Sequence, residues 1–178
     1  MIRIGVLADT HIPGRAKELP TAVLQAFKDV ERIIHAGDIT SMGVIEQLAA
    51  LTPVTAVAGN VDGPEIHQAF GEKAIIDTGH YRIGVVHGHG EKGRTPERAF
   101  ERFKDDGVDC IIFGHSHMPY CQYHNGILLF NPGSPTDKRR NDYYSFGIIE
   151  IDTMVTPRLI YFNKGNEIMS NVLRKSND

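Results

Sequence analysis

The sequence predicts an α/β protein built from layers of helix and sheet, and two observations support this. Apolar runs of strand length, rich in Ile and Val, recur along the chain. Helical patterns separate the early runs, whereas the later runs pair as hairpins around turns such as Asn125-Gly126. This order predicts either one mixed sheet or two stacked sheets, with helices on the outside.

Each expected strand is a short apolar segment that ends at a turn or at polar side chains. The turns Thr78-Gly79, Asn125-Gly126 and Asp152-Thr153 predict three hairpins. The expected strands are residues 2–8, 32–35, 54–58, 74–77, 81–86, 109–113, 119–123, 127–130, 144–151 and 157–162.

Three helices are expected between strands. Pro20 suits the first turn of one helix, and Ser41 can cap the next. Thr95-Pro96 begins a third helix, and Gly107 ends it.

The length of 178 residues fits one domain, expected over residues 1–163. A polar tail, 164–178, follows, in which Ile168, Val172 and Leu173 could support one helical turn. A net charge of −3 and a pI near 6.3 argue against nucleic acid as a tight partner. No signal peptide and no run approaching the ~20 apolar residues of a membrane span are present, and no CxxC motif occurs. These features predict a cytoplasmic protein.

Five of the expected strands end in Asp, Asn or His, usually beside a glycine. In an open α/β sheet, ligands bind outside the carboxyl ends of the strands. Any one of these motifs is also typical of an ordinary turn, but five together predict one shared metal site. The motifs are Asp9-Thr-His11, Gly37-Asp38, Gly59-Asn60, His87-Gly-His89 and Gly114-His115-Ser-His117.

The candidate ligands are carboxylates, one amide and imidazoles, without thiolate. This set suits Mn²⁺, Fe, Zn²⁺, Co²⁺ or Ni²⁺ better than Ca²⁺. The sequence offers seven candidate ligands. One metal rarely takes seven ligands at ~2 Å, whereas two metals that share a bridging carboxylate would use them all. Two metals ~3.5–4 Å apart can activate a bridging water and clamp a phosphoryl group. The candidates are Asp9, His11, Asp38, Asn60, His87, His115 and His117.

In their order, these five motifs resemble the calcineurin-like metallophosphoesterase superfamily, and in particular its small bacterial and archaeal phosphodiesterase branch. The resemblance extends from Met1 to about Phe162. It implies a four-layer αββα sandwich with two mixed β-sheets. It also implies two divalent metal ions, for which we expect Mn²⁺, with Fe, Zn²⁺, Ni²⁺ or Co²⁺ as alternatives.

The resemblance also implies a role for each ligand. Asp38 would bridge the metals, because its two oxygens can each face one cation. Attack by a metal-bridging hydroxide would then hydrolyse the ester. The first metal would be held by Asp9, His11 and His117, and the second by Asn60, His87 and His115.

One position departs from the family pattern. Many members carry a histidine directly after the motif asparagine, where it protonates the leaving oxygen, but this chain has Val61. His89 is the nearest candidate for a replacement acid, and the alternative is that it contacts substrate or solvent. The catalytic candidates are therefore Asp38, Asn60 and His89. Asp62 would orient a neighbouring histidine or water. Without a strong acid, activated esters should be favoured.

Other polar residues fit simpler roles. His35 is expected to be a packed residue or to support a ligand. Arg15 is expected to be a solvated loop residue, with a phosphate contact as the alternative. Ser134, near the site by the resemblance, is a weak candidate for phosphate binding. The cluster Lys138-Arg139-Arg140 is more typical of a solvated face than of a substrate site.

The sequence therefore predicts a dinuclear phosphodiesterase that acts on a small phosphate ester. The alternatives are a phosphomonoesterase or nuclease with the same site, and a non-catalytic protein-interaction scaffold, as in a eukaryotic retromer subunit that resembles this fold. The sequence leaves the physiological substrate open, and a homo-oligomer is among the alternatives for the assembly.

Overall fold

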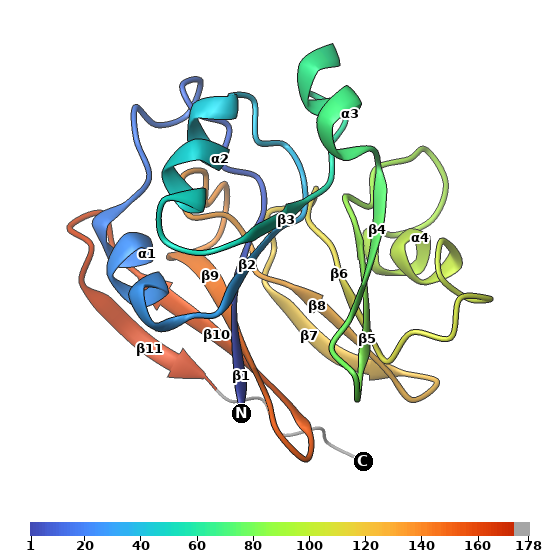
Figure 1. Ribbon diagram of the computed structural model, residues 1–178. Coiled ribbons are helices and arrows are strands. Elements are labelled where there is room, and N and C mark those ends of the chain that lie inside the picture. The colour runs from blue at the N-terminus through green and yellow to red at the C-terminus, as the bar shows by residue number, and fades with distance from the viewer. Residues whose placement is uncertain (173–178) are drawn as a thin grey trace.

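A computed structural model describes residues 1–172, and its strands form two mixed sheets (Figure 1). The larger sheet has the order β11-β10-β9-β1-β2-β3, in which β1, β2 and β3 are parallel. Its strands are β1 (Ile2–Leu7), β2 (Arg32–His35), β3 (Val54–Ala56), β9 (Tyr144–Ile151), β10 (Val155–Phe162) and β11 (Ile168–Val172).

The smaller sheet has the order β4-β5-β6-β8-β7, in which β5, β6 and β8 are parallel and the edge strands are antiparallel. All ten strands that the sequence predicts for the two sheets match in place within two residues, and the largest differences are that β3 ends and β10 begins two residues early. The strands of the smaller sheet are β4 (Lys73–Asp77), β5 (Arg82–Val86), β6 (Cys110–Ile112), β7 (Tyr120–His124) and β8 (Ile127–Asn131).

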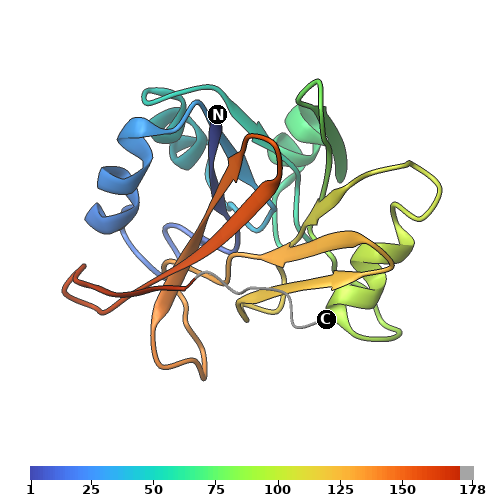
Figure 2. The same ribbon diagram turned by 90° about the horizontal axis from the view of Figure 1, so that it is seen from below.

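Helices cover the outer face of each sheet, so the layers run helix, sheet, sheet, helix, as Figure 2 shows from below. One apolar cluster lies between α1, α2 and the larger sheet, a second between the two sheets, and a third between the smaller sheet and α4. The predicted αββα sandwich is confirmed. The helices are α1 (Thr21–Ala26), a 3₁₀ turn (Phe27–Asp29), α2 (Met42–Ala49), α3 (Pro64–Phe70) and α4 (Thr95–Glu101).

Local sequence signals explain several element ends. Asn125 and Gly126 have φ of 49° and 80°, as a tight hairpin turn requires. The side chain of Ser41 accepts a hydrogen bond from the Gly43 backbone N–H, and so caps α2. The third predicted helix, α4, ends at Glu101, earlier than the predicted end at Gly107.

Two elements differ from the sequence prediction. Helix α3 was not predicted, because among its seven residues only Ile66 is buried. The suggestion of a helical turn in the tail is wrong, since Ile168–Val172 form β11, which pairs antiparallel with β10. The tail therefore extends the larger sheet, and Leu173 lies outside the described residues. Within the described part, no helix has the length and apolar character to cross a bilayer.

Strand direction places the loops that carry the polar motifs at one edge of the molecule. β1, β2 and β3 run parallel in one sheet, and β5 and β6 run parallel in the other. Their carboxyl ends meet at the top of Figure 1, on the side where α3 lies. All five motifs follow these strands, so their side chains come from both sheets.

Candidate metal centre

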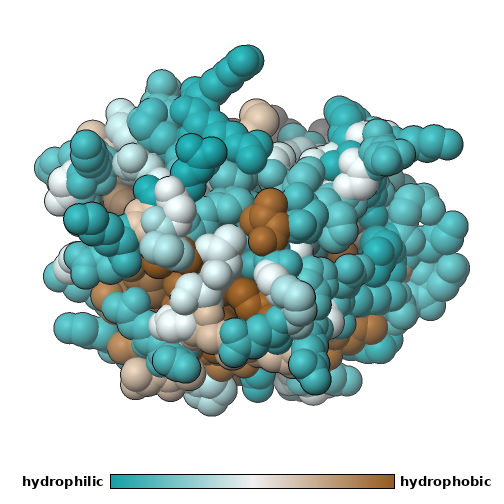
Figure 3. All heavy atoms as spheres, turned by 90° about the horizontal axis from the view of Figure 1, so that it is seen from above, coloured by the Kyte–Doolittle hydropathy of each residue, from teal (hydrophilic) through white to brown (hydrophobic). Residues whose placement is uncertain are grey.

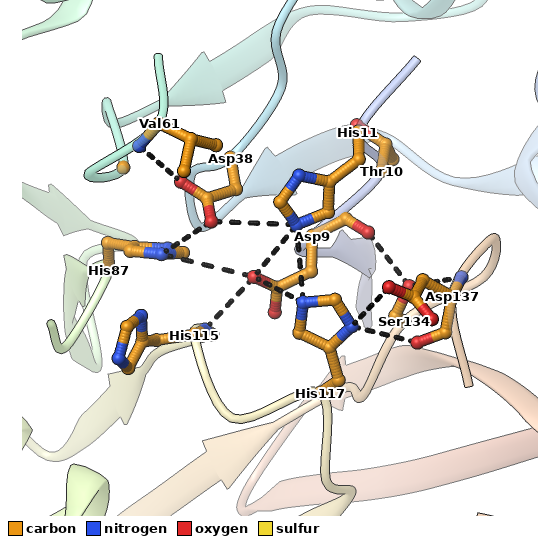
Figure 4. Close-up of polar contacts among 12 residues, drawn as sticks. Asp9, Thr10, His11, Asp38, Val61, His87, His115, His117, Ser134 and Asp137 are labelled. Atoms are coloured by element: carbon orange, nitrogen blue, oxygen red, sulfur yellow. Dashed lines mark hydrogen bonds and ion pairs between the residues drawn. The ribbon is translucent and has the colours of Figure 1, made fainter. Parts of the chain in front are cut away.

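The seven predicted ligands gather where the two sheets meet, and Figure 4 shows most of their side chains turned toward a common centre. Three of them form a first group. The candidate ligand atoms of Asp9, His11 and His117 all lie within 4.8 Å of one another. The Nε2 atoms of the two histidines are 3.2 Å apart, and Asp9 Oδ1 lies 3.5 Å from His117 Nε2.

A second group lies beside the first. The ligand atoms of Asp38, His87 and His115 also lie within 4.8 Å of one another. Asp38 Oδ2 is 3.2 Å from His87 Nε2, and Asn60 Oδ1 is 3.0 Å from His115 Nδ1. Asn60 therefore adds an amide oxygen at the rim of this group.

Asp38 joins the two groups through one oxygen. Its Oδ2 lies 3.5 Å from His11 Nε2 in the first group and 3.2 Å from His87 Nε2 in the second. The other oxygen, Oδ1, accepts a hydrogen bond of 3.1 Å from the Val61 backbone N–H. This differs from the expectation that each oxygen faces its own cation, because the amide of Val61 occupies the side of Oδ1.

Backbone carbonyls set the orientation of two of the imidazoles. His87 Nδ1 lies 2.7 Å from the carbonyl oxygen of Ala36, and His117 Nδ1 lies 2.8 Å from that of Asp137. Since a carbonyl oxygen can only accept, each Nδ1 carries a hydrogen, and Nε2 is the ring nitrogen that is left to face the ligand group. This is the usual orientation of metal-binding histidines.

Burial also shapes the charges of the site. It raises the pKa of Asp9 to about 8, because the carboxylate is wholly removed from water. It lowers the pKa of His115 and of His117 to about 4, so both imidazoles are neutral at pH 7. Burial also acts to raise the pKa of Asp38, but the contact with His87 outweighs it and lowers the value to about 2.

The backbone is strained at five of the seven candidate ligands. Asp9, His11, Asp38, His115 and His117 have φ of 55°, 44°, 56°, 67° and 58°. Few non-glycine residues adopt this left-handed region, and residues that do are concentrated at functional sites, where the surrounding structure holds them. The strain is therefore independent support for a functional role of these loops.

Glycines allow the loops to approach closely. A Cβ on Gly59 would overlap the carboxylate and backbone nitrogen of Asp38. A Cβ on Gly114 would lie 2.7 Å from the Ala8 Cβ and 3.0 Å from Asp9 Oδ2. The glycines beside the motif residues are therefore required by packing between neighbouring loops.

Asp62 and Ser134 have roles other than those expected. The Asp62 carboxylate accepts 2.7 Å hydrogen bonds from the backbone N–H groups of Thr40 and Gly59, so it ties two ligand loops together and does not orient a histidine. Ser134 is buried and donates to the carbonyl oxygen of Asp9 over 2.8 Å. It supports the loop and is not placed to bind phosphate.

The donor set fits cations at both groups. Asp9 Oδ2 and His87 Nε2 are buried, and neither makes a hydrogen bond among the described residues. A buried carboxylate oxygen and a buried imidazole nitrogen without partners are costly unless a cation coordinates them. Two groups of O and N donors that share one carboxylate oxygen match the coordination needs of two divalent ions.

A cavity of about 600 Å³ opens in front of these ligands and is lined by His11, Asp38, Asn60 and His115. Figure 3 shows this side of the molecule from above, with apolar side chains grouped among hydrophilic ones. Val61 also lines the cavity and is 51% exposed.

Two cavity residues were assigned elsewhere from the sequence. Arg15 and Arg139 both line the cavity, although the sequence suggested a solvated loop residue and a solvated basic face. Arg15 follows the first motif, which is a sequence signal for this position. No such signal locates Arg139, because the fold of the loop around residues 134–141 determines its position.

His89, the predicted replacement acid, lies beside the ligands but lines a neighbouring cavity of about 420 Å³. Its ring centroid is 5.7 Å from that of His87 and 6.4 Å from that of His115. His35, expected to be a packed residue, is fully buried, and its Nε2 lies 3.0 Å from Thr10 Oγ1.

Comparisons with known proteins agree with this geometry. A probable metallophosphoesterase of Methanothermobacter thermautotrophicus is 41% identical over 143 residues, which cover 78% of this chain and 80% of the relative. A phosphodiesterase of Methanocaldococcus jannaschii is 30% identical over 148 residues, covering 74% and 83%. Vps29 from Entamoeba histolytica, solved with Zn²⁺, superposes with a TM-score of 0.79 at 25% identity, covering 97% of this chain and 99% of that one.

The family model described as the calcineurin-like phosphoesterase superfamily domain matches residues 2–154. These residues include both ligand groups and all the strands that carry them. The chain belongs to the calcineurin-like phosphoesterase superfamily.

Proposed function

We propose that this protein is a dinuclear metal-dependent phosphodiesterase that acts on a small phosphate ester. The observation that carries the proposal is the position of Asp38 Oδ2, which faces a histidine of each ligand group at 3.5 Å and 3.2 Å. Asp38 would therefore serve as a ligand to the cation of either group. Mn²⁺ is the first choice, with Fe, Zn²⁺, Ni²⁺ and Co²⁺ as alternatives.

Each group would hold one ion, with Asp9, His11 and His117 at the first and Asn60, His87 and His115 at the second. Two bound cations would supply an activated hydroxide and neutralise charge on the phosphoryl oxygens. The protein contributes the positions of the donors, since carbonyl contacts and strained loops hold them before substrate binds.

The cavity supports a preference for diesters and activated esters. Val61 occupies the position where many family members carry an acid, and its side chain cannot donate a proton. A good leaving group needs no such proton. His89 remains our proposed acid for less activated substrates, although it would have to act from the neighbouring cavity.

The relatives support the same proposal. The Methanocaldococcus jannaschii relative is named a phosphodiesterase, and the Entamoeba histolytica Vps29 was solved with Zn²⁺. Asp9, His11, His87 and His117 offer oxygen and nitrogen donors of the kind that Zn²⁺ and Mn²⁺ both accept.

The test is a screen of phosphodiesters, phosphomonoesters and cyclic nucleotides after the protein has been loaded with each divalent metal. We expect the highest kcat/KM with Mn²⁺ and bis(p-nitrophenyl) phosphate, and a loss of at least about a hundredfold in Asp38→Asn. Hydrolysis of none of these esters with any metal would refute the proposal. It would favour the alternative of an interaction scaffold, in which Asp38→Asn has no turnover to lose.

A further inference from the structure

Two arginines from separate loops line the cavity in front of the ligand groups. Arg15 follows the first motif, and Arg139 lies in the loop between β8 and β9. The side chain of Arg15 is 65% exposed, and Arg139 is also exposed, so a ligand in the cavity can reach both guanidinium groups.

Asp137 fixes both arginines relative to the ligands. Its Oδ2 lies 3.3 Å from Arg15 Nε, and its Oδ1 accepts a 3.3 Å hydrogen bond from the Arg139 backbone N–H. Its carbonyl oxygen accepts from His117 Nδ1 over 2.8 Å. One residue therefore connects a candidate metal ligand with the side chain of Arg15 and the backbone of Arg139.

The guanidinium of Arg139 makes no hydrogen bond or ion pair with the residues that the structure describes. Its charge nevertheless acts on the site. It lowers the pKa values of His11 and His117, as the larger effect of burial also does, and for Asp9 it opposes burial, which raises the pKa. Arg139 is thus an unpaired cation that faces the mouth of the cavity.

The charges at the centre indicate which group would pair with the guanidinium of Arg139. Two divalent cations are balanced by Asp9, Asp38, a hydroxide nucleophile and the single negative charge of a simple diester. Asp137 pairs with Arg15. A simple diester therefore balances the two cations and leaves the guanidinium of Arg139 free to bind a further anion on the substrate.

We infer that the substrate is a phosphodiester that carries a second phosphate group, and that Arg139, with Arg15 beside it, binds this second phosphate. The inference rests on the proposed function for the scissile phosphate, which the ligand groups would hold. Arginine suits the task, because its planar fork can donate two parallel hydrogen bonds to phosphate oxygens.

A matched pair of substrates tests the inference with the metal-loaded protein. Thymidine 5′-(p-nitrophenyl phosphate) and its 3′-phosphorylated form release the same leaving group and differ only in the second phosphate. We expect the second phosphate to raise kcat/KM about tenfold, and Arg139→Gln to reduce that advantage to about twofold. Arg15→Gln should reduce it in part. Arg140→Gln, at an exposed neighbour outside the cavity lining, should keep it.

A binding measurement separates this inference from the proposed function. By calorimetry, thymidine 3′,5′-bisphosphate should bind about tenfold more tightly than thymidine 5′-monophosphate, and Arg139→Gln should remove the difference. If neither ester is hydrolysed but this difference is found, the proposed function fails and the second phosphate site stands. Equal binding of the two nucleotides, or equal losses for Arg139→Gln and Arg140→Gln, would overturn the inference.

Discussion

Removal of the Asp62 carboxylate should destabilise the fold as well as the site. Asp62 is 8% exposed, and its two oxygens accept 2.7 Å hydrogen bonds from the N–H groups of Thr40 and Gly59. Hydrogen bonds to a charged group contribute ~1.5–3 kcal/mol each. The Thr40 amide is only partly buried and can rebind water, so we expect Asp62→Ala to lower the free energy of unfolding by about 3 kcal/mol.

Urea unfolding measures this loss, and a fall in Tm of about 6–12 °C should accompany it. Asp62→Asn keeps one acceptor oxygen, so it should lose about half as much free energy of unfolding. Asp142→Ala is the control, since Asp142 is exposed and makes no hydrogen bond within the described part of the chain. A loss below ~0.5 kcal/mol in Asp62→Ala, equal to that of the control, would refute the assigned role.

Three further changes test other parts of the account. Val61→His should raise phosphomonoesterase kcat/KM at least about tenfold, because the exposed position regains a proton donor, and an unchanged rate would contradict this. Gly59→Ala should weaken Mn²⁺ binding about tenfold in calorimetry, since the new Cβ displaces Asp38. An unchanged affinity would contradict this, because it would mean that the loops move apart without displacing the ligands. Burial lowers the pKa of His35 from 6.5 to about 3. As the pH drops from 6.5 toward 3, the unfolded chain protonates His35 and the folded protein does not, so the free energy of unfolding falls. Between pH 7 and pH 5 the wild type should lose about 2 kcal/mol more than His35→Gln in urea unfolding, and parallel losses would refute a neutral His35.

The layers of the fold, and the edge of the sheets where the candidate ligands lie, could be predicted from sequence because both depend on local patterns. Alternating strands and helices determine the layers, and the Asn125-Gly126 turn alone specifies one hairpin. Polar residues directly after β1, β2 and β6 identify the edge, since a parallel strand delivers its last residues to one end of the sheet.

Features that depend on tertiary contacts could not be predicted in this way. β11 is short, lies in an otherwise polar tail and forms by pairing with β10. The positions of Arg15 and Arg139 depend on Asp137, whose contacts join loops more than a hundred residues apart in the chain. Asp38 presents only Oδ2 to the two ligand groups because its Oδ1 accepts a hydrogen bond from the Val61 N–H, a contact that no residue pattern reveals.

Helix α3 is a different case, because signals for it were present. Pro64 occupies the first turn after Gly63, and Gly71 ends the helix with a φ of 65°. Its apolar face is reduced to Ile66, with Phe70 partly buried, so hydrophobic periodicity alone does not reveal it.

We propose that the protein hydrolyses a phosphodiester with two metal ions, for both of which Asp38 would be a ligand. The most direct measurement is a titration of metal-depleted protein with Mn²⁺ while the release of p-nitrophenol from bis(p-nitrophenyl) phosphate is followed. We predict that the rate rises until two equivalents of Mn²⁺ are bound and that Asp38→Asn shows no such rise. Full activity at one equivalent, or no hydrolysis at any Mn²⁺ concentration, would contradict the claim.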